Sequence, residues 1–332
     1  MKVTISDVAR LAGVSTATVS HTVNSTRYVS PSTKERVCQA IAQLGYTPDA
    51  SARSFRTGKR RTVGFVVPDI SNKFFASMIE AVETHLSAQG YHLLIANTKE
   101  DPQREAVSLR LLSAGLVDGL LVASTMPEPE PFEALIPAGF PVVLVDRTFQ
   151  PRRFPSVCVS SFQPVYRSVC RLAGKGDRRI GILAGLPRLS STRERVAAYQ
   201  EAVADCGLPQ DEALIRYGNS MEHSAQTCLD ALLEQRCDAI VAAQGLMGLE
   251  AAVYLHKKGL RLTQDIDLVS FVDYDSDVHQ LYADQMDQIV QPVEALGQAA
   301  AAQILRCIES PGAPVTEQVL SSAYRPCKAP LE

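Results

Sequence analysis

The chain has 332 residues, of which 46% are hydrophobic and 21% charged, so it is long enough to bury the cores of two or three domains. No apolar run approaches the ~18 residues of a membrane-spanning helix, and the N-terminus lacks the pattern of a secretion signal. The eight cysteines are scattered without a Cys-x-x-Cys pair, which is typical of reduced thiols in the cytoplasm and argues against a disulfide framework.

The charges are divided unevenly along the chain. Overall there are 33 Lys or Arg and 36 Asp or Glu residues, a net charge of -3. Residues 1–61 hold ten basic and only three acidic side chains, whereas the rest holds 23 basic and 33 acidic ones. A basic head on an acidic body is typical of a protein whose small N-terminal module binds nucleic acid.

The first segment predicts two short helices joined by a tight turn. Gly13 supplies the positive φ that such a turn needs, and Ser15 is suited to cap the second helix, in which Val19 and Val23 share a face. The apolar residues of the first helix recur at spacings of three and four: Ile5, Val8, Ala9 and Ala12. This pattern predicts a helix-turn-helix whose second helix lies in a DNA major groove.

A third helix is predicted to start at Ser30 and to end at Gly45, with Pro48 just beyond. Residues 49–61 then form a basic link that can make one or two helical turns. Because so short a helix is unstable alone in water, we expect it to become ordered only against a partner helix or DNA.

From Thr62 the sequence alternates between short apolar strands and amphipathic helices. Strands are predicted at residues 63–67, 92–96, 119–123, 142–145, 180–184, 239–242 and 268–271. Helices between them are predicted at residues 74–89, 102–114, 193–206, 224–234 and 246–257. Such alternation indicates parallel sheets covered on both faces, with ligands bound at the carboxyl ends of the strands.

In several motifs the chain resembles the LacI/GalR family, the lactose-repressor and galactose-repressor family of transcription regulators. The motifs are TISDVA at 4–9, GVSTATVS at 13–20, LGYTP at 44–48, ARS at 52–54, VGFVVPD at 63–69, VDGLL at 117–121 and Asp146-Arg147. The resemblance covers the whole chain. It implies an N-terminal all-α helix-turn-helix head plus an α/β core of two doubly wound parallel-sheet subdomains, like periplasmic binding proteins.

The resemblance also implies domain boundaries. The helix-turn-helix domain would span residues 1–48, the hinge helix 49–61, and the effector-binding and dimerisation core 62–332. In the core, the N-subdomain would comprise about 62–161 and 292–320, and the C-subdomain about 162–291 and 321–332. The chain would cross between them near residues 161, 291 and 320.

Chemistry and resemblance agree on the side chains that would contact DNA. Thr16, Ala17 and His21 lie on the outward face of the second helix, where Thr and His can hydrogen-bond base edges and Ala can contact a thymine methyl. Packing of His21 on the third helix is an alternative. Residues predicted to contact phosphates and fix the register are Ser6, Ser15, Ser20, Asn24 and Arg27.

The hinge departs from the family pattern at one position. Where relatives usually insert a Leu between central base pairs in the minor groove, this sequence has Phe55, which can act as the same kind of wedge. Ala52 and Arg53 would flank it, and Arg56 would lie near the DNA backbone. Alternatively, Phe55 packs two hinge helices together.

Side chains at the predicted strand ends form the candidate effector pocket. Asp146 and Arg195 are the principal candidates, and Arg195 matches the family's ligand-binding arginine. Phe74 and Phe75 can offer an apolar wall, although ordinary core packing explains them equally well. The other candidates are polar: Asp69, Asn72, Lys73, Ser124, Arg147, Gln244 and Asp273.

Three departures from the family pattern bear on the ligand. Gln244-Gly245 stands where relatives often have Asn-Asp, and Val272 where they often have Asp. Lys73 replaces a Pro that is common in sugar-binding relatives. These changes favour an anionic ligand, such as a sugar acid or sugar phosphate, held by Lys73, Arg147 and Arg195. A simple surface position for Lys73 is the alternative.

Together these features predict a cytoplasmic, nucleoid-associated regulator that binds a pseudo-palindromic operator in double-stranded DNA as a homodimer or tetramer. The main prediction is a repressor of a carbohydrate or sugar-acid operon, controlled by a small sugar or sugar acid. Alternatives are an activator, a corepressor-dependent purine or nucleoside regulator and, remotely, a solute-binding protein. No catalytic set or cofactor motif is visible, and residues 273–277 lack the Gly and closing Glu of a calcium loop, so neither a cofactor nor a metal is expected.

Overall fold

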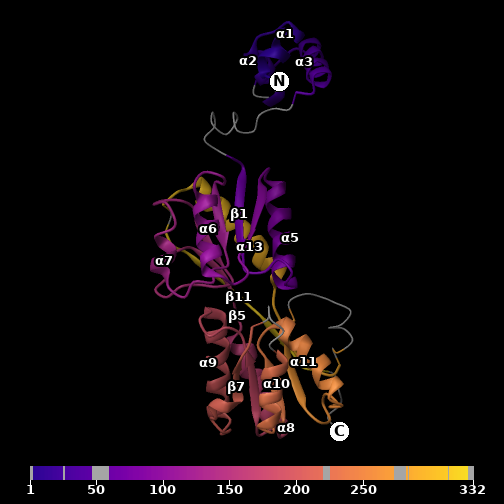
Figure 1. The fold of residues 1–332 in the computed structure, drawn as a ribbon, viewed down its shortest axis with the longest axis vertical. Coiled ribbons are helices and arrows are strands. Elements are labelled where there is room, and N and C mark those ends of the chain that lie inside the picture. The colour runs from indigo at the N-terminus through magenta and orange to yellow at the C-terminus, as the bar shows by residue number, and fades with distance from the viewer. Residues whose placement is uncertain are drawn as a thin grey trace. The chain divides into compact units, whose positions relative to one another are not determined.

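The computed structural model describes residues 3–24, 27–46, 60–219, 225–272, 282, 284–312 and 314–327, with only the backbone described at Asn24. The chain forms two units, Met1–Arg60 and Arg61–Glu332, which we call the head and the core (Figure 1). No helix in these described ranges is long and apolar enough to cross a membrane.

The head consists of three helices: α1 (Ile5–Ala12), α2 (Thr16–Asn24) and α3 (Pro31–Leu44). The predicted turn is confirmed, since Gly13 adopts φ 63° between α1 and α2. An additional start signal precedes α1, where the Asp7 carboxylate accepts hydrogen bonds from Thr4 N at 3.0 Å and from Thr4 Oγ1 at 2.7 Å. The small apolar core of the head comprises Val8, Ala9, Ala12, Val19, Val37 and Ala40.

The N-terminal sheet of the core has the strand order β11-β5-β4-β3-β1-β2, with every pair parallel. Its strands are β1 (Thr62–Val67), β2 (His92–Asn97), β3 (Gly119–Val122), β4 (Val142–Val145), β5 (Ser156–Ser160) and β11 (Glu317–Ser321). Its helices are α5 (Lys73–Ala88), α6 (Pro102–Ser113), α7 (Pro129–Glu133) and α13 (Val293–Glu309).

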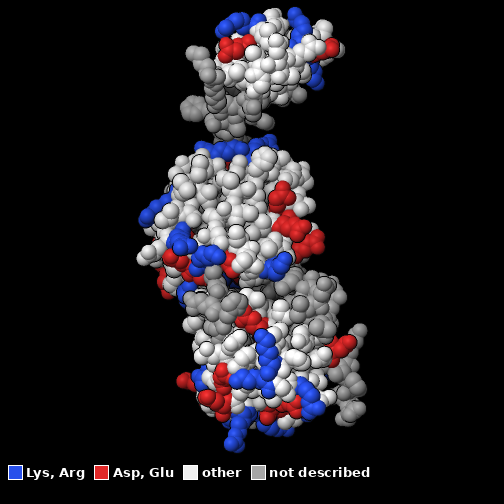
Figure 2. Space-filling model, turned by 45° about the vertical axis from the view of Figure 1, so that its right-hand side comes forward, with Lys and Arg blue, Asp and Glu red and all other residues white. Residues whose placement is uncertain are grey.

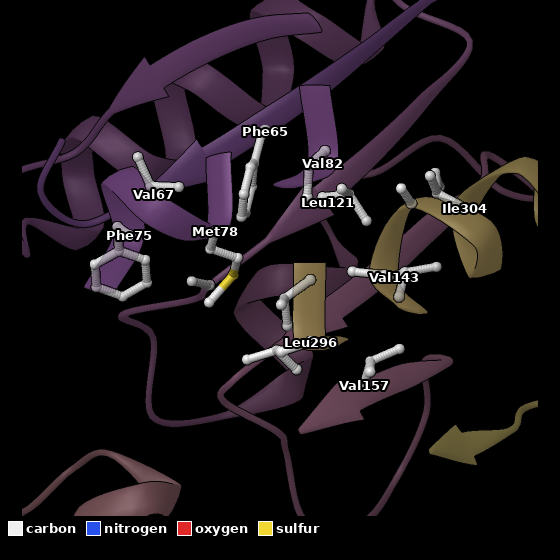
Figure 3. Close-up of a cluster of buried hydrophobic side chains, with 14 of the residues drawn as sticks. Phe65, Val67, Phe75, Met78, Val82, Leu121, Val143, Val157, Leu296 and Ile304 are labelled. Carbon is white, nitrogen blue, oxygen red and sulfur yellow. The ribbon is translucent and has the colours of Figure 1, made fainter. Parts of the chain in front are cut away.

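Two apolar layers enclose this sheet because alternate strand residues face opposite sides. On one side, Phe65 and Val67 of β1 pack with α5 and α13 (Figure 3). On the other side, Val66 packs with α6 and α7. Although α13 comes late in the chain, it lies among the N-terminal elements in Figure 1, and a Cβ on Gly297 would lie only 2.7 Å from Ala81 Cβ. The glycine therefore permits the close approach of α5 and α13.

The C-terminal sheet has the strand order β12-β10-β9-β8-β6-β7. Its strands are β6 (Ile180–Ala184), β7 (Ile215–Tyr217), β8 (Ala239–Ala242), β9 (Asp267–Val272), β10 (Asp287–Val290) and β12 (Ala323–Arg325). Its helices are α8 (Phe162–Lys175), α9 (Ser190–Asp205), α10 (Ala225–Glu234) and α11 (Gly245–Lys257), with a short 3-10 turn at Glu212–Leu214. The predicted pair of doubly wound sheets is thus confirmed, with one departure, since the edge strand β12 runs antiparallel to β10.

The chain passes between the two sheets three times. It leaves the N-terminal sheet after β5 at Ser161, returns through Gln291 between β10 and α13, and leaves again through Ser322 between β11 and β12. Each sheet is therefore assembled from separate stretches of sequence. The three crossover segments follow the carboxyl ends of β5, β10 and β11, and carboxyl strand ends are also where the candidate pocket is expected.

Candidate DNA-reading helix and effector pocket

Helix α2 presents one buried and one exposed face. Ser15 caps it as predicted, because its Oγ accepts a hydrogen bond from Thr18 N at 3.1 Å. Val19 is fully buried against the other helices, while Thr16 and Ala17 are exposed and His21 is half-buried. The two exposed side chains lie at the start of the helix, where a recognition helix contacts base edges.

The candidate phosphate contacts lie mostly at the surface of the head. Ser6, Ser15 and Arg27 are exposed and Ser20 is half-buried, while the side chain of Asn24 lies outside the described residues. Figure 2 shows both basic and acidic side chains on the head. Among the described residues of this unit the basic ones are Arg10, Arg27, Lys34, Arg36 and Arg60, and the acidic ones are Asp7 and Glu35. The predicted hinge contacts Ala52, Arg53, Phe55 and Arg56 lie outside the described residues.

A cavity opens between the two sheets of the core. Most of the predicted pocket residues line it: Asp69, Asn72, Phe74, Phe75, Asp146, Arg147, Arg195 and Gln244. Six further residues complete the lining: Glu100, Leu189, Ser191, Gly245, Leu246 and Gln291. The cavity lies where strands β1, β4 and β8 end, as expected for parallel sheets.

Two residues that were predicted to lie in the pocket, Lys73 and Ser124, do not line the cavity. Lys73 is exposed at the start of α5 and is absent from the lining, because the inward face of that helix is taken by Phe74 and Phe75. Ser124 is buried outside the lining, and its Oγ donates a 2.5 Å hydrogen bond to Glu105. Asp273 lies outside the described residues, as does the segment considered as a calcium loop.

Arg147 is engaged within the N-terminal side of the pocket. Its Nη1 and Nη2 donate to the two Glu100 carboxylate oxygens at 3.0 and 2.6 Å, and its guanidinium lies 5.8 Å from the Phe75 ring centroid. Burial opposes the charged form, but the charge and hydrogen bonds of Glu100, together with the charges of Asp146 and Glu105, outweigh it and raise the pKa of Arg147. The predicted trio of cations does not line the cavity together, because Lys73 lies outside the lining and the charge of Arg147 is balanced by Glu100.

Asp146 occupies a strained backbone position directly after β4. Its φ is 66°, in the left-handed region that side chains other than glycine rarely adopt. Lys99 and Glu100, after β2, also have positive φ values of 57° and 56°. Non-glycine residues in this conformation cluster at ligand sites, where the surrounding structure holds them in place. Two strained turns therefore meet at the N-terminal side of this cavity.

Arg195 forms the C-terminal side of the pocket from the second turn of α9. Its Nη1 donates to Ala243 O at 2.6 Å and its Nη2 to Gln291 Oε1 at 3.1 Å, and the guanidinium stacks 4.0 Å above the Phe271 ring. The side chain is 6% exposed, so these contacts fix its orientation toward the cavity.

Gln244 presents a hydrogen-bond acceptor to the pocket. Its Oε1 is buried without a hydrogen-bond partner in the described structure, which favours a ligand that donates an N–H or O–H group there. Gly185 provides the space for this side chain, because a Cβ at position 185 would lie 2.3 Å from Gln244 Nε2 and 2.9 Å from Thr192 Oγ1.

Gly185→Ala is therefore expected to displace the Gln244 amide and weaken ligand binding by about tenfold, the equivalent of one net hydrogen bond to a buried group. Titration calorimetry of the variant measures this change. Gly174→Ala is the matched control, because a Cβ there meets no atom within 4 Å and the backbone is not in the left-handed region. Unchanged affinity in Gly185→Ala would show that Gln244 does not contact the ligand.

Several residues in and around the cavity do not follow from the sequence. Glu100 lies after β2, a strand end that was not considered, and Gln291 lies in a crossover whose partner could not be known. Arg188 donates to Thr125 O at 3.2 Å and to Glu100 O at 3.1 Å, so it links the two sides of the core. Glu105 is wholly buried beneath this link; burial raises its pKa, and hydrogen bonds from Ser124 and Thr125 oppose the rise. No cluster of three potential metal ligands occurs in the part of the chain that the structure describes.

Two family models match the chain. Residues 4–49 match the bacterial regulatory proteins of the lacI family, and residues 60–328 match the periplasmic binding proteins and sugar binding domain of the LacI family. The curated relatives include the HTH-type transcriptional repressor PurR of Vibrio atlanticus, 32% identical over 310 residues that cover 92% of both chains. PurR of Haemophilus influenzae is also 32% identical, over 92% of this chain and 91% of its own.

Solved structures agree with this assignment. The lac repressor dimer bound to operator and the anti-inducer ONPF shares the fold, with a TM-score of 0.86 and 22% identity over 99% of this chain and 100% of that chain. The transcriptional regulator CelR–cellobiose complex is 28% identical, with a TM-score of 0.71 over 97% of this chain and 98% of that one. The chain therefore belongs to the LacI family of bacterial regulatory proteins, whose members are DNA-binding transcription regulators and not enzymes.

Proposed function

We propose that this regulator is a repressor whose operator binding is controlled by a neutral ligand of the nucleobase or nucleoside class. The observation that carries the proposal is the composition of the cavity lining. The lining carries three carboxylates, Asp69, Glu100 and Asp146, of which Glu100 is paired with Arg147, and the buried Gln244 Oε1 is a further acceptor. A ligand that fits offers several N–H or O–H donors and needs no anionic group.

The aromatic wall supports a flat ligand. Phe74 and Phe75 line the cavity with their rings 5.0 Å apart and nearly perpendicular, so that a planar ring can pack on one of them. The curated relatives that match along 92% of the chain are repressors named PurR, which favours the purine alternative over the sugar acid that the sequence analysis put first.

A neutral sugar is the second candidate. The 28% identical CelR structure is a complex with cellobiose, and sugars also combine several hydroxyl donors with an apolar ring face. The carboxylates and amides of the lining suit either ligand class. The two classes differ in the aromatic contact, because a nucleobase stacks through its π system whereas a sugar packs through C–H groups.

A thermal-shift screen of the full chain separates these candidates. We expect hypoxanthine, guanine, adenine or a nucleoside to stabilise the protein, by about 2.7 kcal/mol at 100 times the dissociation constant. A shift confined to cellobiose or glucose would replace the purine proposal by the sugar one, and a shift confined to sugar acids or sugar phosphates would overturn both. Lys73→Ala is the matched control and is expected to bind as the wild type does, because Lys73 is exposed outside the lining.

The head is proposed to read the operator through the exposed start of α2. Thr16 and Ala17 are accessible for base contacts, and His21 is proposed to join them. We expect Ala17→Glu to abolish operator binding, because a carboxylate would face the bases and phosphates at this position. Fluorescence anisotropy with operator selected from a random DNA pool measures the loss, and Glu35→Ala is a control on another exposed helix position. Retained affinity would exclude α2 from the groove.

Phe55 is proposed to act as a wedge in the minor groove, flanked by Ala52 and Arg53 and with Arg56 near the DNA backbone. Phe55→Ala should then weaken operator binding and reduce DNA bending together. Unchanged binding and bending would refute the wedge.

A homodimer is proposed because the edge of the N-terminal sheet exposes apolar side chains. Leu94 and Ile95 of β2 are 42% and 47% exposed, and Val107 and Leu111 of α6 are 63% and 59% exposed. A pseudo-palindromic operator requires two copies of the head. Sedimentation of Leu111→Glu as a monomer, against a wild-type dimer, would support this surface.

A further inference from the structure

The first crossover of the core is held by a single carboxylate of α9. Glu194 is half-buried, and its Oε1 accepts a hydrogen bond from Ser160 Oγ at 2.6 Å. The same oxygen accepts from the backbone N–H groups of Ser161 and Phe162, each at 3.3 Å. Ser160 ends β5 in the N-terminal sheet and Phe162 begins α8, so one oxygen holds both sides of the crossover to α9.

The third crossover is bonded to the first. Ser322 donates to Ser160 O through its backbone N–H at 3.1 Å and through its Oγ at 3.0 Å, and its Oγ lies 3.2 Å from Ser161 Oγ. Ser161 and Ser322 are buried, at 0% and 8% exposure, so water competes little for these bonds. A displacement of the first crossover is therefore passed directly to the third.

The second crossover is bonded to the next residue of α9. Arg195, which lines the cavity, donates a hydrogen bond to Gln291 Oε1 at 3.1 Å. Gln291 lies in the second crossover segment, between β10 and α13. The adjacent residues Glu194 and Arg195 therefore contact different crossover segments. Arg195 contacts the cavity and the second crossover, while Glu194 contacts the first and, through Ser160, the third.

We propose that Glu194 is the positioning residue that transmits a displacement of Arg195 in the pocket to the first and third crossovers. The turn of α9 is rigid on the scale of hydrogen-bond lengths, so a shift of Arg195 carries the Glu194 backbone with it. The three hydrogen bonds to Oε1 then displace the crossover segments, and this displacement changes the relative orientation of the two sheets. This inference rests on the proposed control of operator binding by the pocket, but its test needs no ligand.

Hydrogen exchange of the full chain tests the contacts. In Glu194→Ala, we expect exchange at least tenfold faster in peptides that cover Ser161, Phe162 and Ser322. Glu201→Ala is the matched control, since Glu201 is an exposed glutamate on the same helix, and it should change these rates less than twofold. Glu194→Gln keeps an oxygen that can accept the same bonds and should restore most of the protection.

A second comparison tests whether Glu194 transmits a change at Arg195 to the crossovers. If Glu194 only stabilised the structure, the effect of an Arg195 substitution at Ser322 would not depend on it. Arg195→Lys keeps the charge but not the paired bonds to Ala243 and Gln291, and we expect it to change exchange at Ser322 at least threefold. Combined with Glu194→Ala, the same change should have no further effect at Ser322. The proposal is overturned if Arg195→Lys leaves Ser322 unaffected, or if its effect is the same with and without Glu194. Either result stands whatever the thermal-shift screen finds, so the two proposals fail separately.

Discussion

Replacing Arg195 by Met is expected to weaken binding of the pocket's ligand by about 2–5 kcal/mol, or roughly 30- to 4,000-fold in dissociation constant. The guanidinium is buried and bonded to Ala243 O and Gln291 Oε1, and Met keeps much of the volume but supplies no donors. Both oxygens then lose these bonds beside the cavity, and the ligand loses a charged donor. Titration calorimetry with the compound that stabilises the wild type most strongly measures the loss.

Arg193→Met provides the control for this experiment. Arg193 lies on the same helix but is exposed, and its Nη1 donates to Arg188 O at 2.6 Å outside the cavity lining. Its replacement should leave the ligand affinity within about threefold. Should both variants bind equally well, Arg195 would be a structural residue of α9 and not a ligand contact.

Replacing Phe65 by Ala is expected to lower the free energy of unfolding of the core by about 3–5 kcal/mol. Phe65 is fully buried on β1 and points into the layer between the N-terminal sheet and helices α5 and α13, as Figure 3 shows. Because interiors are close-packed, the neighbours relax only partly, and a cavity remains. Chemical denaturation followed by circular dichroism measures the change.

The exposed Val315→Ala serves as the control for the core substitution. Val315 is 52% exposed, so its truncation should alter the free energy of unfolding by no more than about 0.5 kcal/mol. A loss below about 1 kcal/mol in Phe65→Ala would contradict the packing described for this layer.

Much of the fold was predictable because it depends on short-range sequence patterns, such as the spacing of apolar residues and the positions of turn glycines. The helices of the head follow from the spacing of Val8, Ala9 and Ala12, and the turn from Gly13. Central strands such as β1 and β8 are continuous apolar runs. The edge strands β7, β11 and β12 and the inner strands β5 and β10 were not predicted, because each is short and mixes polar with apolar residues.

The pocket was only partly predictable because its contacts are long-range. Strand ends identify Asp69, Asp146 and Gln244 without knowledge of the fold. The pairing of Arg147 with Glu100 spans 47 positions, and that of Arg195 with Gln291 spans 96, so neither follows from spacing. Lys73 was predicted to lie in the pocket, but it is exposed outside the lining. Its position next to Phe74 in the sequence does not determine which side of the helix start faces the cavity.

The late position of α13 and β11 in the chain has a consequence for biosynthesis. When the ribosome has made the first five strands of the N-terminal sheet, the helix that covers Phe65 and Met78 does not yet exist. The elements from α8 to β10 are contiguous, so they can fold as they emerge, while the first half waits with an uncovered apolar layer. Until residues 293–309 are synthesised, we expect that layer to offer a binding surface to chaperones, and a nascent chain that stalls earlier to be prone to aggregation.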